Sequence, residues 1–166
     1  MSTDNLGKKE AREKLKDLVE DIKVGMMVTA LDKRPLSAVP MTTKKIDDAG
    51  NIWFLSSKTS EHNQNILNNK EVHMLYSDPS DMEFVSVSGI AEIITDKQTL
   101  KDLYDKATDI WFDGVDDPNL TAIKFIPDDA YYWDPKHNKY VTLYKLGIAA
   151  LTGDQKDIGE KGKLDL

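Results

Sequence analysis

The sequence predicts a mainly β protein with peripheral helices, in which six strands form a small closed or split barrel. Six segments carry the apolar patterns of strands, and several follow one another across short turns. Three of the strands contain a residue that bends or interrupts a sheet, namely Pro40, Gly89 and Pro127. A barrel of this size fills its interior with side chains, so we expect any ligand on the outside or at a subunit boundary.

The composition is that of a globular protein with neither disulfides nor a basic face. Of 166 residues, 40% are hydrophobic and 31% are charged, and the formal net charge is −7. The absence of cysteine excludes disulfides and thiolate catalysis, and the acidic balance argues against a nucleic-acid partner. No apolar run is long enough to span a membrane, and the polar N-terminus does not resemble a signal peptide. We therefore expect a cytoplasmic protein that binds neither nucleic acid nor membrane.

The N-terminal half is predicted to contain one helix and three strands. Lys8–Ile22 places its apolar residues on a single helical stripe and charged residues elsewhere. Pro40 cannot donate to a sheet ladder, so its strand should lie at an edge or contain a bulge. The expected strands, separated by turns that contain Asp, Gly or Pro, are Met26–Leu31, Leu36–Ile46 and Ile52–Ser56.

The C-terminal half is predicted to add three strands and three helices. A short helix is expected at about Glu61–Asn69, and a last one at Tyr140–Leu151. Thr95–Gln98 has the form of a capping box, and the helix behind it would carry one apolar face from Leu100 to Trp111. The expected strands are Val72–Tyr76, Met82–Ile94 and Leu120–Trp133.

The domain boundary is expected near the C-terminus. Residues 1–153 should form a single split-barrel domain that includes the N-terminal helix. The tail, residues 154–166, is mostly charged and rich in glycine, so we expect it to be mobile unless it docks.

The most informative segment for function is Asn51–Ile66. It reads as a strand that enters a hydroxyl-rich turn containing Ser56, Ser57, Thr59 and Ser60, and the turn opens a helix. The N–H groups of a helix N-terminus are unpaired and carry partial positive charge, so this junction could hold a phosphate. The alternative is ordinary N-capping, in which Ser60 satisfies its own helix and nothing is bound.

Several segments, in their order and spacing, resemble a known family. The chain contains MMVTAL, VPMTT, NIWFLSSKTSEH, FVSVSGIAEIITD, WFDGVDDPNLTAIKF and AYYWD, and it ends in AALTGDQKDIGEKGKLDL. Over about Glu10 to Leu166 these segments are similar to the general stress protein 26 branch of the pyridoxamine-phosphate-oxidase-like, FMN-binding split barrels. The resemblance implies a six-stranded split barrel that forms a homodimer, with FMN bound at the dimer interface.

The resemblance also implies roles for particular residues. One group would lie along the flavin ring and the ribityl chain, a second would surround the ribityl and phosphate groups, and aromatic residues of the partner subunit would close the site. In this sequence the first group is Val39, Pro40, Met41 and Thr42; the second is Leu55, Ser56, Ser57, Ser60 and His62; the aromatic positions match Trp111 and Trp133.

The sequence departs from the family pattern at its cations. Relatives usually carry Arg where Val39 stands and Lys where His62 stands, and the wider oxidase pattern has Arg-Lys in place of Glu61-His62. A charge-assisted bond to phosphate contributes roughly 1.5–3 kcal/mol. We therefore expect weaker FMN binding than in relatives, improving below pH 7 as His62, with an unperturbed pKa of about 6.5, becomes protonated.

Three functions stay open at this point. The chain could be an FMN-binding stress protein with flavin oxidoreductase activity, a non-catalytic flavin carrier or sensor, or a split-barrel dimer that has lost its cofactor and acts as an interaction protein. No catalytic acid or base stands out, true pyridoxamine phosphate oxidation is not expected, and the spacing of the three histidines predicts no metal site. Dimerisation is also favoured by an aromatic set that we expect to be exposed, comprising Trp111, Phe112, Tyr131, Tyr132 and Trp133.

Overall fold

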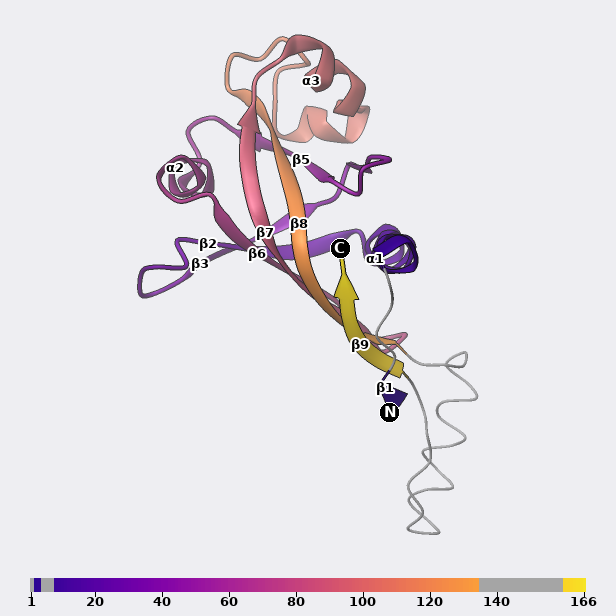
Figure 1. Cartoon of the computed structure of the whole chain (residues 1–166). Coiled ribbons are helices and arrows are strands. Elements are labelled where there is room, and N and C mark those ends of the chain that lie inside the picture. Colours follow the sequence, from indigo (N-terminus) through magenta and orange to yellow (C-terminus); the bar gives the residue numbers. More distant parts are fainter. Residues whose placement is uncertain (1, 4–7, 135–159) are drawn as a thin grey trace.

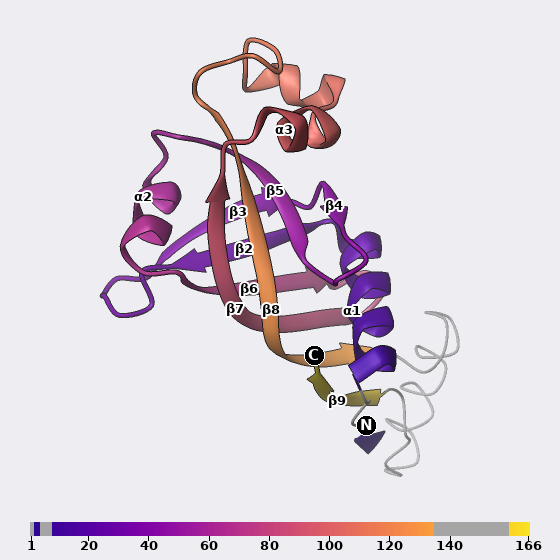
Figure 2. The ribbon, with the colours of Figure 1, turned by 45° about the horizontal axis from the view of Figure 1, so that its top comes forward.

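The computed structural model describes residues 2–3, 8–134 and 160–166, and in them one curled, mostly antiparallel sheet forms a half-barrel (Figures 1 and 2). Helices α1 (Lys8–Ile22) and α2 (Glu61–Asn68) lie on opposite sides of it, and α3 (Lys97–Leu103) with the 3-10 helix η1 (Lys106–Ile110) lies at one end. The strands are β1 (Ser2–Thr3), β2 (Val24–Thr29), β3 (Ser37–Thr42), β4 (Lys45–Ile46), β5 (Ile52–Ser57), β6 (Glu71–Asp78), β7 (Glu83–Ile94), β8 (Leu120–Asp134) and β9 (Glu160–Asp165).

The sheet follows the order β1-β9-β8-β7-β6-β2-β3, with β5 joined to β8 and β4 joined to β5. The long strand β8 pairs with β7 on one side. On its other side its first part pairs with β5 and its last part with β9. β3 ends the order and also lies close to β5. The strand that contains Pro40 is therefore an edge strand, as predicted.

The predicted bend at Gly89 is confirmed. The register between β7 and β8 shifts between Ser88 and Gly89, and Gly89 pairs with Pro127. A Cβ atom at Gly89 would stand 2.2 Å from the backbone oxygen of Ile126, so only glycine allows the two strands to approach this closely. This irregularity increases the local twist and lets two long strands curl together.

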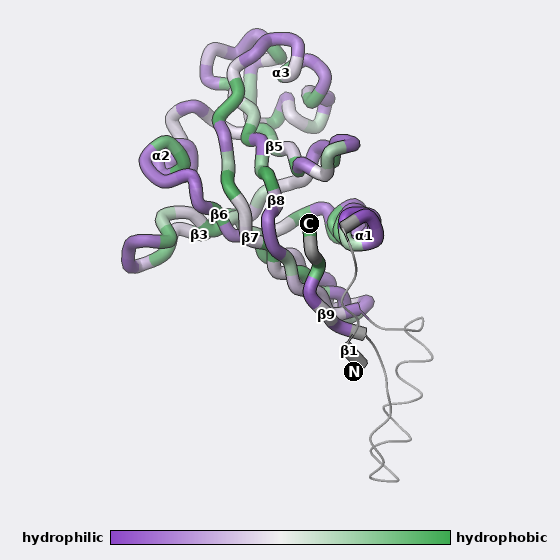
Figure 3. The backbone as a smooth tube through the Cα atoms, in the orientation of Figure 1, coloured by the Kyte–Doolittle hydropathy of each residue, from purple (hydrophilic) through white to green (hydrophobic). Residues whose placement is uncertain are grey.

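The main core fills the concave side of the sheet. It combines the inward residues of β2, β5, β6, β7 and β8 with the apolar stripe of α1 and with Ile66 from α2. Figure 3 shows hydrophobic residues gathered along β7 and β8, whereas the β2–β3 turn is hydrophilic. Tyr132 is fully buried in this core, so the prediction that it belongs to an exposed aromatic set is wrong. Its side chain points inward because Tyr131 and Trp133 take the opposite face of β8.

Two predicted elements are divided in the structure. The predicted strand Leu36–Ile46 becomes β3 and β4, because Thr43 N–H donates to the Lys23 carbonyl whereas Lys44 N–H donates to that of Trp53. The chain thus changes partner strand at this point. The predicted helix that would reach Trp111 ends at Leu103, since Tyr104 is extended and Asp105 caps the separate helix η1.

Other differences concern the ends of elements. The cap of α3 is Asp96 rather than Thr95, and its carboxylate accepts the N–H of Thr99 at 2.9 Å. Part of the predicted tail docks: β9 pairs with β8, and Leu164 is fully buried in the main core. The predicted helix Tyr140–Leu151 lies outside the described residues. Within the described part of the chain, no helix is both long and apolar enough to cross a membrane.

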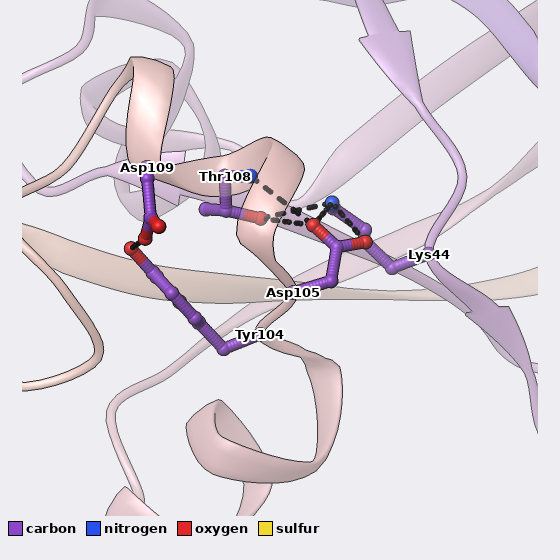
Figure 4. Close-up of polar contacts among 5 residues, drawn as sticks. All are labelled: Lys44, Tyr104, Asp105, Thr108 and Asp109. Carbon is purple, nitrogen blue, oxygen red and sulfur yellow. Dashed lines mark hydrogen bonds and ion pairs between the residues drawn. The ribbon is translucent and has the colours of Figure 1, made fainter.

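A polar contact ties the α3–η1 end to the barrel (Figure 4). The Lys44 ammonium donates to both carboxylate oxygens of Asp105 at 3.0 Å and to the Thr108 hydroxyl at 2.9 Å. Beside it, the Tyr104 hydroxyl donates to Asp109 at 2.6 Å, and this bond raises the pKa of Tyr104 to about 12. Under this end lies a second, smaller core that includes Leu100, Leu103 and Leu120.

Candidate functional site

The junction between β5 and α2 forms as predicted, with Ser60 as the N-cap. Its hydroxyl accepts the N–H of Asn63 at 3.3 Å, while Ser60 N–H donates to the Ser57 carbonyl at 3.0 Å. The turn is also attached to the start of β8, because Lys58 N–H donates to the Asn119 carbonyl at 2.7 Å. The other N–H groups of the first helical turn have no intrahelical acceptor, which leaves them available to an anion.

Ser56, predicted to lie beside the ribityl and phosphate groups, uses its hydroxyl within the protein. It is 4% exposed, and its hydroxyl donates to the side-chain carbonyl of Asn63 on α2. Asn63 in turn donates to the Thr121 hydroxyl at 2.9 Å, and Thr121 donates to the Ser56 backbone carbonyl at 2.9 Å. A hydroxyl group has one hydrogen to donate, so Ser56 serves an internal network that fixes α2 against β5 and β8.

The hydroxyls that remain near the surface are those of Ser57, Thr59 and Ser60. Ser57 and Ser60 are half-buried and Thr59 is exposed, and the Ser57 and Thr59 hydroxyls lie 3.1 Å apart. Between them stands Lys58, whose side chain is exposed. Sequence reasoning missed Lys58, although a cation inside a hydroxyl-rich turn was the available signal. Lys58 is the cation of this turn.

His62 lies in an environment that disfavours its charged form. The ring is half-buried, and its Nε2 atom is buried without a hydrogen-bond partner among the described residues. Burial lowers the pKa of His62 below its usual value, and the neighbouring Glu61 carboxylate opposes that shift. Glu61 itself is exposed. The expected gain in FMN affinity below pH 7 depends on the charged form of His62, which this burial disfavours.

The flavin-ring residues predicted on β3 alternate between its two faces. Met41 is buried in the main core and Val39 packs against it, whereas Pro40 and Thr42 are exposed. Because β3 lies close to β5, the structure brings the two predicted groups of flavin residues to the same part of the sheet. Leu55, on β5, packs in the second core beneath α3.

The two tryptophans predicted to close the site lie far apart in one chain. Trp111 follows η1 and is 79% exposed, and η1 lies at the end of the molecule where β8 begins. Trp133 lies near the other end of β8, half-buried, with its ring centroid 4.8 Å from that of Tyr131. At about 3.3 Å per residue, the length of β8 keeps them from meeting in one subunit.

The convex face of the sheet exposes an apolar surface. Met26 is 40% exposed and pairs with Pro40 on one side and with Leu75, 44% exposed, on the other. We call this the convex patch and define it by Val24, Met26, Pro40 and Leu75. Two strands further on, Tyr131 and Trp133 face the same way. Among the described residues, no group of His, Asp and Glu side chains could hold a metal ion.

The chain belongs to the pyridoxamine 5'-phosphate oxidase-like family, whose model matches residues 10–157. It is 30% identical to General stress protein 26 of Bacillus subtilis (strain 168) over 129 residues, which is 75% of this chain and 89% of that protein. These findings confirm the family resemblance inferred from the motifs.

Solved structures support the same assignment. A protein from Jannaschia sp. CCS1, provisionally named general stress protein 26, superposes with a TM-score of 0.80 at 25% identity, covering 95% of this chain and 99% of that one. The general stress FMN/FAD binding protein of Xanthomonas citri superposes with a TM-score of 0.65 at 26% identity, covering 76% of this chain and 89% of that one. The fold and the family are thus established together.

Proposed function

We propose that this chain binds FMN between two copies of itself and acts as a flavin-dependent oxidoreductase. The observation that carries the proposal is the β5–α2 junction, where surface hydroxyls, the first-turn N–H groups of α2 and Lys58 follow a strand that contacts the edge strand β3. The flavin-binding description of the Xanthomonas citri protein supports the same ligand class.

The residues present suit the phosphate end of FMN. Ser57, Thr59 and Ser60 offer hydroxyls, Lys58 offers charge, and the helix terminus favours an anion. Pro40 and Thr42 would lie along the flavin ring. FMN would supply the hydride or electron transfer, so the protein needs to bind and orient it rather than provide a catalytic acid.

The convex patch supports the homodimer. Exposed apolar residues on three adjacent strands form a surface that a second copy would cover. Trp111 and Trp133 lie far apart in each chain, so a partner subunit would contribute only one of them to a given site. The proposed form of the protein is therefore a homodimer of two split-barrel chains.

Removing the Lys58 charge should weaken FMN binding selectively. For Lys58→Gln we expect about a tenfold increase in the Kd of FMN, because an exposed charge-assisted bond to phosphate is lost. Riboflavin, which lacks the phosphate, should bind both forms equally. Fluorescence titration of each flavin measures the two constants, and Lys70→Gln, an exposed lysine beyond the other end of α2, is the matched control. Equal FMN binding by the Lys58 variant and the wild type would remove Lys58 from the phosphate site.

The affinity for FMN should not rise as the pH falls towards 7, contrary to what the sequence alone suggested. Because burial lowers the pKa of His62, the ring stays neutral from about pH 8.5 to 7, and its charge appears only below its usual pKa. We expect the ratio of FMN to riboflavin affinity to be flat across that range and His62→Gln to leave it unchanged at pH 7.5. A ratio that rises steadily from pH 8.5 to 7 in the wild type, but not in the variant, would contradict this account.

One observation favours loss of the cofactor as a second candidate. Ser56 and His62 were both predicted to lie near the phosphate. The Ser56 hydroxyl instead donates to Asn63, and the His62 ring is half-buried with a lowered pKa. A dimer that stays colourless after incubation with FMN and desalting would select this candidate. A dimer that binds FMN but shows no turnover with reduced nicotinamide cofactors would select the carrier or sensor.

A further inference from the structure

A small cavity lies away from the β5–α2 junction, on the side of the sheet that α1 covers. Its volume is about 80 Å³, which is room for several water-sized groups. Four separate parts of the chain line it: α1, the β4–β5 turn, the bend of β8 at Pro127, and Leu166 after β9. The cavity therefore joins the N-terminal helix to the C-terminal strand.

Two cations border the cavity from one face of α1. Arg12 and Lys16 are four residues apart, so their side chains lie side by side. A Cβ atom at Gly50 would lie 3.8 Å from Cγ and Cδ of Arg12, which shows that the methylene stem of Arg12 lies over the turn. Among the described residues, Arg12 has no acceptor, and Lys16 has only a 3.9 Å contact with Glu20.

The inner wall of the cavity is apolar. Leu15 is 3% exposed and Ile46 is 9% exposed, and Ile126 and Pro127 stand beside them. This wall disfavours a fully hydrated inorganic ion and favours a ligand with a small hydrocarbon body.

The carboxylate of Asp47, in the turn that borders the cavity, is engaged within that turn. Asp47, in the β4–β5 turn, accepts the backbone N–H groups of Ala49 and Asn51, the side-chain amide of Asn51 and the indole N–H of Trp53, all at 2.9–3.0 Å. Its oxygens are occupied within the turn, and among the described residues no bond joins them to Arg12 or Lys16.

We propose that this cavity binds a small organic carboxylate. The planar carboxylate would accept from the Arg12 guanidinium, whose paired N–H groups match its two oxygens, and from Lys16. Its short hydrocarbon body would lie between Leu15 and Ile46. Because the ligand would contact both α1 and Leu166, it would also hold β9 in place. The proposal does not depend on flavin binding.

The test measures n-butyrate binding to the intact chain by saturation-transfer NMR and by amide chemical-shift titration. We expect saturable binding, with n-butanol, n-butylamine and inorganic phosphate each at least about tenfold weaker. The double variant Arg12→Gln/Lys16→Gln should lose at least about tenfold in butyrate affinity. Lys9→Gln, which removes an exposed lysine from the same helix, should bind as the wild type does.

A second readout separates ligand binding from nonspecific salt effects. Butyrate should slow hydrogen exchange at β9 amides in the wild type and leave it unchanged in the double variant. The proposal is overturned if butyrate binding does not saturate, if phosphate or n-butanol binds as tightly as butyrate, or if the double variant binds butyrate like the wild type. Arg12 and Lys16 are both exposed, so the double variant is expected to fold.

Discussion

Replacing Gly89 with alanine is expected to destabilise the protein by about 3 kcal/mol or more. The added Cβ would stand 2.2 Å from the Ile126 oxygen, 3.0 Å from its carbonyl carbon and 2.9 Å from the Phe125 ring. Two of these neighbours are backbone atoms of the paired strand, so relief requires β7 and β8 to separate where they curl. Urea unfolding, monitored by tryptophan fluorescence, measures the loss.

Gly114→Ala provides the matched control. Gly114 has a φ of +86° and would give its Cβ no neighbour within 4 Å, so only the backbone conformation is penalised, by about 1 kcal/mol. A Gly89→Ala variant as stable as the wild type would contradict the close approach of the two strands. If this variant does not fold, its recovery from inclusion bodies beside a soluble Gly114→Ala protein gives the same ranking.

Replacing Asn63 with alanine is expected to cost about 3 kcal/mol and to abolish tight flavin binding. Asn63 is 1% exposed, accepts the Ser56 hydroxyl and donates to that of Thr121 at 2.9 Å. Alanine would leave two buried hydroxyls with poorer partners, at about 1–3 kcal/mol, and would open a small cavity. It would also release α2 from β5 and β8, so the helix N-terminus would no longer be held in position.

The free energy of unfolding and the FMN affinity should both fall in the Asn63→Ala variant. Chemical denaturation gives the stability change, and FMN titration at a temperature where the variant stays folded gives the ligand effect. Asn68→Ala, at the exposed end of the same helix, should change neither. A folded Asn63→Ala protein with wild-type FMN affinity would mean that the network has no influence on the site.

The sequence predicted features that depend on local chemistry. The position of Gly89 in a long alternating strand indicated a bulge, Pro40 indicated an edge strand, and Ser60 before a short helix indicated its cap. In each case one residue type restricts the backbone or satisfies a specific donor, and the structure confirms all three.

Features that depend on long-range pairing were not predictable in the same way. Near Thr43 the chain changes its hydrogen-bonding partner, because Thr43 N–H donates to the Lys23 carbonyl and Lys44 N–H donates to the Trp53 carbonyl. No local sequence pattern indicates this change. Tyr132 is an aromatic residue between two others, Tyr131 and Trp133. It is buried because its side chain lies on the inward face of β8. Ser56 is buried beside Asn63 and Thr121, and burial lowers the pKa of His62, so the predicted phosphate residues could not be ranked before the fold was known.

The central claim, that two chains bind FMN between them, is tested most directly by sedimentation velocity of the FMN-incubated, desalted protein, detected by both protein and flavin absorbance. The account predicts a single species of twice the 18.7 kDa chain mass carrying one FMN per chain. An 18.7 kDa species, or a dimer that sediments without visible absorbance while the flavin is lost on desalting, would contradict it.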